Sequence, residues 1–65
     1  MIERVWYGVE LTTDNAEVFK HYLRENSIKY EPSSCYNLIH FEVYMTNDER
    51  KAANNFLQEM LHNAL

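Results

Sequence analysis

Residues 35–49 carry the sequence CYNLIHFEVYMTNDE, an alternating strand that leads directly into the start of a helix. Side chains of a strand point alternately to its two faces, so period-two alternation divides this segment into two sets. One set is Ile39, Phe41, Val43 and Met45, and the other is Tyr36, Leu38, His40, Glu42 and Tyr44. The segment from Cys35 to Met45 is the longest strand that the sequence predicts.

The helix start that follows is the clearest local signal in the chain. Thr46 or Asn47 can act as the N-cap, and Glu49 stands where a capping box requires a glutamate. Acidic residues in the first turn also favour the positive end of the helix dipole. Apolar residues then recur at helical spacing nearly to the C-terminus: Ala53, Phe56, Leu57, Met60, Leu61, Ala64 and Leu65.

A second alternating strand covers residues 3–12 near the N-terminus. Its inward set is predicted to be Val5, Tyr7, Val9 and Leu11, and its outward set Arg4, Trp6, Gly8 and Glu10. A glycine inside a strand commonly marks a bulge or the close approach of another backbone. The sequence therefore predicts one of these irregularities at Gly8.

Residues 14–31 predict a helix followed by a short strand. Asp14 and Glu17 resemble a capping box, apolar residues repeat at helical spacing to Leu23, and Asn26 is placed as a left-handed terminator. The strand is predicted at 28–31, ended by a turn at Pro32–Ser34.

The element order is strand-helix-strand-strand-helix, which predicts an α+β fold. A right-handed crossover and a hairpin suggest that the first strand lies parallel to the last, with strand 28–31 antiparallel on the far side. This gives a three-stranded mixed sheet with both helices on one face. The order resembles a ferredoxin-like fold that lacks its last strand, which leaves the outer edge of residues 4–11 bare.

Length and cysteine content bound how such a fold can be stabilised. The 65 residues form a single domain, 1–65, with a core so small that added support is expected. Cys35 is the only cysteine, so no disulfide can form within one chain. We therefore expect a homodimer, either through the bare strand edge, which comprises Arg4, Val5, Tyr7, Val9 and Leu11, or through the sheet face that the helices leave uncovered.

Charge argues against nucleic acid as the partner. The net charge is −4, and the six Lys and Arg form no cluster longer than Arg50–Lys51, whereas nucleic-acid binders usually carry a basic face. An acidic balance suits a basic partner surface instead. No secretory signal and no apolar run of membrane-spanning length are visible, so a cytoplasmic location is expected.

No residue pattern predicts catalysis, a metal or a cofactor. His21, His40 and His62 lack the spacing of metal ligands. Cys35 and His40 are five apart on the predicted strand, which would place them on opposite faces. Glu10 and Glu42 share a face, where they are interpreted as ordinary solvated carboxylates.

The outward sheet face carries the functional prediction. If the helices cover the other face, an apolar and aromatic patch is left uncovered, and such patches mark interfaces. The predicted patch comprises Trp6, Tyr36, Leu38, His40 and Tyr44. It resembles the RNA-recognition motif, whose sheet aromatics stack on bases, but the motif's Lys/Arg-Gly-Phe-type signature and final strand are missing here. The aromatics are therefore predicted to meet a protein.

The sequence thus predicts a small acidic, non-enzymatic interaction protein, a regulator or inhibitor of the kind that phages and mobile elements encode. The alternative is a small-molecule sensor, since the element order is similar to that of ACT-like modules with ligand at a dimer interface. Those modules typically place a glycine in the first strand-helix loop, where this chain has Thr12-Thr13-Asp14-Asn15. A nucleic-acid binder and a small enzyme rank below both.

Overall fold

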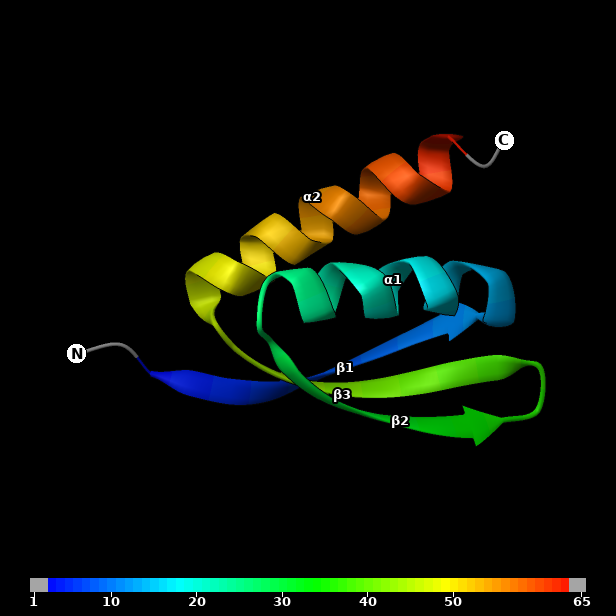
Figure 1. The fold of residues 1–65 in the computed structure, drawn as a ribbon, viewed down its shortest axis with the longest axis horizontal. Coiled ribbons are helices and arrows are strands. Elements are labelled where there is room, and N and C mark those ends of the chain that lie inside the picture. The colour runs from blue at the N-terminus through cyan, green and yellow to red at the C-terminus, as the bar shows by residue number, and fades with distance from the viewer. Residues whose placement is uncertain (1–2, 64–65) are drawn as a thin grey trace.

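The computed structural model describes residues 3–63. Its elements are β1 (Arg4–Thr12), α1 (Thr13–Glu25), β2 (Lys29–Cys35), β3 (Leu38–Thr46) and α2 (Asn47–Asn63). Figure 1 shows both helices on one face of a three-stranded sheet. The predicted α+β class and the placement of the helices are confirmed. Ala64 and Leu65, the last residues of the predicted helical stripe, lie outside the described residues.

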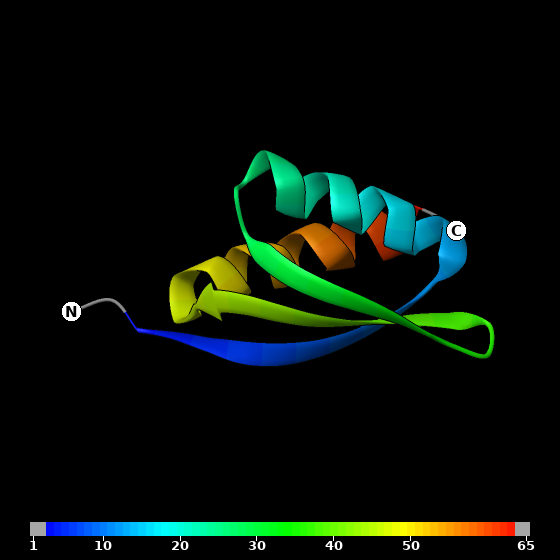
Figure 2. The ribbon, with the colours of Figure 1, turned by 60° about the horizontal axis from the view of Figure 1, so that its bottom comes forward.

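The strand directions correct the predicted mixed sheet. The strand order is β1-β3-β2, and β3 is antiparallel to both neighbours. The right-handed crossover rule applies to β1 and β2, which α1 connects and which run parallel. The hairpin then reverses the chain, so β3 between them must oppose both. In Figure 2 the sheet lies below the helices, and β1, one of its two edge strands, leads at its end directly into α1.

The β2–β3 turn lies four residues later than predicted. β2 continues through Pro32, and the chain reverses at Tyr36 and Asn37 between the paired residues Cys35 and Leu38. Proline is tolerated on an edge strand, so Pro32 does not end β2. The reversal instead uses Tyr36, whose φ of 57° lies in the left-handed region.

This shift changes the predicted relation between Cys35 and His40. Cys35 ends β2 rather than beginning β3, and it lies opposite Leu38. Residues paired across strands point to the same face, so Cys35 and His40 share the face away from the helices. The expectation that they lie on opposite faces was wrong, because it counted them along a single strand.

Gly8 is not a bulge, because the register of β1 with β3 is continuous from the Arg4–Thr46 pair to the Thr12–Leu38 pair. A Cβ atom on Gly8 would lie 3.2 Å from Cε1 of His40. The glycine therefore makes room for an imidazole ring, not for another backbone.

The ends of α1 differ from prediction. Asn26 has a φ of −98°, and Ser27, with a φ of 56°, is the left-handed residue. The N–H of Ser27 donates to the carbonyl of Arg24 (3.2 Å), and the N–H of Ile28 donates to that of Leu23 (2.9 Å). These bonds form a Schellman motif, in which the buried Ile28 and Leu23 provide the apolar pair.

The predicted capping box at Asp14 and Glu17 does not form. The N-cap of α1 is Thr12, without a side-chain hydrogen bond, and Glu17 accepts a hydrogen bond from Lys20 (3.2 Å) instead. The helix begins one residue before Asp14, so Asp14 lies in its first turn rather than at its cap.

The capping box of α2 is confirmed. The Thr46 N–H donates to Oε1 of Glu49 (2.8 Å), and the Glu49 N–H donates to Oγ1 of Thr46 (3.1 Å). Farther along, α2 rises away from the sheet (Figure 1). Of the described stripe residues, Ala53 is fully buried, whereas Leu61 is 47% exposed.

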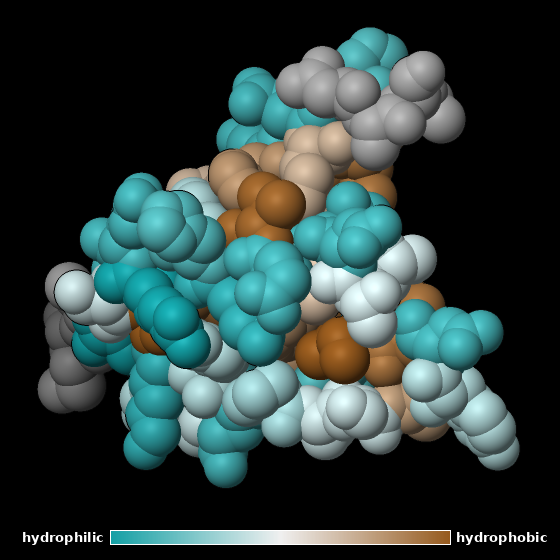
Figure 3. Space-filling model, turned by 45° about the vertical axis from the view of Figure 1, so that its right-hand side comes forward, coloured by the Kyte–Doolittle hydropathy of each residue, from teal (hydrophilic) through white to brown (hydrophobic). Residues whose placement is uncertain are grey.

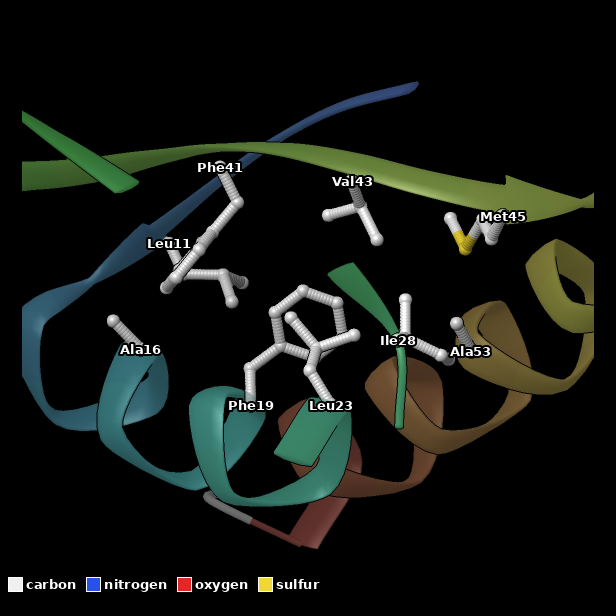
Figure 4. Packing of buried hydrophobic residues seen from close by; sticks show 9 residues of the cluster. All are labelled: Leu11, Ala16, Phe19, Leu23, Ile28, Phe41, Val43, Met45 and Ala53. Atoms are coloured by element: carbon white, nitrogen blue, oxygen red, sulfur yellow. The ribbon is translucent and has the colours of Figure 1, made fainter. Parts of the chain in front are cut away.

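The core is a single apolar cluster between sheet and helices (Figure 4). Phe41, Val43 and Met45 point from β3 toward the helices, as the alternation predicted. The Phe41 ring meets Phe19 of α1 edge-on at 5.4 Å and Tyr30 of β2 at 5.9 Å. The remaining buried members are Leu11, Ala16, Leu23, Ile28 and Ala53.

We expect Phe41→Ala to lower the free energy of unfolding by about 3–5 kcal/mol, because it opens a cavity in the core beneath Phe19 of α1. Trp6→Ala should lower it by a clearly smaller amount, since Trp6 is 44% exposed on the face away from the helices. Urea unfolding of both variants at the same protein concentration measures the two losses in free energy of unfolding. Equal losses would show that Trp6 belongs to the core.

Candidate functional site

The sheet face away from the helices, called the open face here, is a grid of cross-strand rows. Residues paired across β1, β3 and β2 lie side by side in each row. In the order β1-β3-β2, the rows are Trp6-Tyr44-Lys29, Gly8-Glu42-Glu31, Glu10-His40-Ser33 and Thr12-Leu38-Cys35.

One end of the open face is aromatic. The rings of Trp6 and Tyr44 have centroids 5.0 Å apart at an interplanar angle of 40°. The Lys29 ammonium lies 6.0 Å from the centroid of Trp6, at the outer limit of a cation–π contact. Trp6 is held in place by its neighbours yet remains accessible. Such side chains are well suited to anchor an interface, because they combine a large contact area with few rotamers.

The middle of the open face is acidic. His40 lies between two carboxylates: its Nε2 is 2.8 Å from Oε1 of Glu42, and its Nδ1 is 3.7 Å from Oε2 of Glu10. The first distance is that of a hydrogen bond, and the second is that of an ion pair. Glu31 stands directly across from Glu42 in the next strand. Two carboxylates therefore flank the imidazole and a third lies opposite Glu42, so a negative charge remains even when His40 is protonated.

The hydrogen bond to Glu42 raises the pKa of His40 above its ordinary value, and the negative charges of Glu42 and Glu10 add to this effect. Partial desolvation opposes the rise but does not cancel it. Both ring nitrogens face carboxylates, so the doubly protonated imidazolium fits this position best.

This arrangement suits charge pairing more than catalysis. A general base needs a free ring nitrogen, and both nitrogens of His40 are directed at carboxylates. Elsewhere, His21 pairs with Glu25 along α1 (2.9 Å). Within residues 3–63, no group of three or more His, Cys, Asp and Glu is placed to hold a metal ion.

The structure brings together only part of the predicted patch. Trp6 and Tyr44 are in contact, and His40 lies two rows away within the acidic cluster. Leu38 lies at the opposite end of the face, 38% exposed, and Tyr36 is fully exposed in the turn rather than on the sheet. The sequence predicts an alternating strand that includes Tyr36, whereas β3 begins only at Leu38.

The predicted dimer edge is an open strand edge among the described residues. β1 is nine residues long and pairs with β3 on one side only. Leu11 is buried and Val5 is 42% exposed, while Tyr7 and Val9 are half-buried under the helices. The other sheet edge, β2, contains Pro32, whereas β1 has no proline.

The start of α2 supports this edge. The Arg4 guanidinium lies 3.6 Å from Glu49, and the Arg50 guanidinium lies over the Tyr7 ring at 5.2 Å. These contacts fix the first half of β1 against the helix, so the edge is preorganised as a strand.

Sequence reasoning missed an apolar groove between α1 and α2. It has a volume of about 480 Å³ and is lined by Glu17, Val18, His21, Tyr22, Glu25 and Phe56. The Tyr22 and Phe56 rings stack at 4.3 Å. Figure 3 shows apolar surface between polar side chains where α2 lifts away from α1. In the sequence, the groove is indicated by Val18 and Tyr22, two apolar residues beside the buried Ala16, Phe19 and Leu23 of α1.

Comparison with family models, with curated proteins and with solved structures gave no match. Neither helix within residues 3–63 is long and apolar enough to cross a membrane.

The raised pKa of His40 predicts a pH-dependent stability. The pKa of an unfolded histidine is about 6.5. The stabilisation from His40 is therefore fully present below that pH and is lost as pH rises through the higher native pKa. Glu42→Gln should move the native pKa of His40 back toward the ordinary value, as measured by NMR titration of the imidazole.

Asp14→Asn is the matched control, because it removes one negative charge in the first turn of α1. It should leave the His40 titration in place. An unchanged titration in Glu42→Gln would show that the Glu42 contact does not form in solution.

Proposed function

We propose that this chain is a non-enzymatic interaction protein that forms a homodimer through the β1 edge and binds a protein partner through the open face. The observation that carries the proposal is the outer edge of β1, which no other strand within residues 3–63 covers and which is nine residues long without proline or bulge. Proteins normally cover or interrupt such edges, because exposed backbone groups recruit other strands. We also infer a ferredoxin-like fold without its last strand, so a second chain would occupy the vacant position.

The small core supports the dimer. The largest fully buried side chains are Phe19, Phe41, Leu23, Met45 and Val43, all on α1 and β3, and no disulfide reinforces this core. Domains of this size gain much from oligomerisation. Pairing at β1 would satisfy the edge backbone and cover the exposed part of Val5.

The charges of the open face define the partner. Trp6 and Tyr44 offer an aromatic anchor, while Glu31 and Glu42 supply negative charge one row away. The matching surface is a protein that presents an apolar side chain beside a lysine or arginine. A net charge of −4 supports a basic partner, as expected of a small cytoplasmic regulator or inhibitor.

The first test is a lysine on the β1 edge. Val5→Lys should convert a dimer into a folded monomer, because Val5 is already 42% exposed and an edge lysine opposes strand pairing. Val18→Lys is the matched control: it introduces the same charge at a 47% exposed valine on α1 and should leave the dimer intact. Sedimentation velocity gives the mass, and circular dichroism the folding.

A wild-type chain that stays monomeric at high micromolar concentration contradicts the dimer. If Val5→Lys remains dimeric and Trp6→Ala does not, the dimer forms through the open faces instead.

The second test measures partner binding on a peptide array. Peptides with an apolar residue beside Lys or Arg should bind better than the same peptides with Glu. Trp6→Ala should weaken binding at least tenfold, since aromatic anchors dominate interfaces. Val18→Ala, on another surface, is the control. Equal binding of basic and acidic peptides would contradict the proposed partner chemistry.

A further inference from the structure

The β1 strand is complementary to a second copy of itself in one particular register. We infer that two β1 strands pair antiparallel about a twofold axis at Tyr7, with Arg4 opposite Glu10 of the partner subunit and Trp6 opposite Gly8 of the partner subunit. This inference rests on the proposed dimer through the β1 edge and specifies how that dimer is built.

The pleat of β1 limits the registers to consider. Helices of both copies lie on one side of a continuous sheet only if inward-facing residues pair with inward-facing ones. An antiparallel twofold axis must then pass through a residue rather than between two. Near the middle of the strand the candidates are Trp6, Tyr7 and Gly8.

Charge distinguishes the three registers. An axis at Tyr7 places Arg4 against Glu10 of the partner subunit twice, once on each side of the axis. An axis at Trp6 places Arg4 against Gly8 of the partner subunit, and an axis at Gly8 places it against Thr12 of the partner subunit. Opposite charges directly across two strands stabilise the pairing. Arg4 and Glu10 have side chains 47% and 58% exposed, so each can reach a second chain in addition to its own contact with Glu49 or His40.

Side-chain size favours the same register. An axis at Tyr7 places the Trp6 indole opposite Gly8 of the partner subunit, where the missing side chain leaves room for a large aromatic beside the imidazole that packs over Gly8. An axis at Gly8 would set two glycines against each other, so no side chain of β1 would pack across the strand pair at that position. On the helix side, the half-exposed Val5 would meet Val9 of the partner subunit, and the two Tyr7 rings would face each other.

This dimer would also change the acidic cluster of the open face. Arg4 would enter the row that contains Glu10 and His40 of the partner subunit. Each cluster would thus gain a cation from the other chain, and the two open faces would form one continuous surface.

Charge exchange tests the register. Arg4→Glu and Glu10→Arg each place like charges across the strand pair twice, so each variant alone should dimerise at least tenfold more weakly than wild type. A mixture of the two variants restores opposite charges at both positions. The heterodimer should therefore form with nearly wild-type affinity, measured by analytical ultracentrifugation with one variant fluorescently labelled. Each substitution also changes a contact within its own chain, that of Arg4 with Glu49 or that of Glu10 with His40. These changes are the same in the mixture as in each variant alone, so they cannot produce the rescue.

Cross-linking gives an independent reading of the register. In a Cys35→Ser background, Tyr7→Cys should form an intermolecular disulfide faster than Trp6→Cys or Gly8→Cys, since its two copies lie directly opposite each other. A dimeric wild type with no rescue in the mixture, or with fastest cross-linking at position 6 or 8, overturns the register and leaves the edge dimer standing. A monomeric wild type overturns the proposed dimer itself.

Discussion

Backbone pairing of β3 on both of its sides is the constraint on which the rest of the structure depends. A one-residue slip in register would exchange the two faces of a central strand, so pairing fixes both faces at once. Phe41 and Val43 are thereby committed to the core, and His40, Glu42 and Tyr44 to the open face. Among the described residues, the same arrangement leaves β1 paired on one side only. The core, the candidate surface and the proposed dimer edge thus all follow from the position of a single strand.

Periodicity and capping could be predicted because they depend on neighbours in the sequence. The two faces of 38–45 follow from alternation, and the Thr46–Glu49 capping box follows from a spacing of three residues. The position of the hairpin could not be predicted in the same way. Pro32 normally indicates a turn, but on an edge strand it is tolerated, and the reversal occurs where Tyr36 accepts a left-handed backbone. Cys35 and Tyr36 were misplaced for this reason.

The surroundings of His40 depend on residues that only the sheet brings together. Gly8, Glu10 and Glu42 contribute space and charge from two strands, and the spacing between them in the sequence does not indicate a cluster. The antiparallel register aligns the space above Gly8 with the imidazole and sets Glu10 beside it. A strand glycine predicts that something approaches closely, but whether this is a backbone or a side chain depends on the register.

The two sheet edges differ in a way that bears on recognition. β2 combines Pro32 with the charged Lys29 and Glu31, a composition that discourages strand pairing with any chain. β1 carries its charges near the ends of its central segment, positive at Arg4 and negative at Glu10, three residues on either side of Tyr7. A parallel copy in register would meet like charges at both positions, whereas an antiparallel copy centred on Tyr7 meets opposite charges at both. Arg4 and Glu10 would therefore favour an antiparallel copy and oppose a parallel one. Such combined attraction and repulsion can make an open edge selective for its own chain.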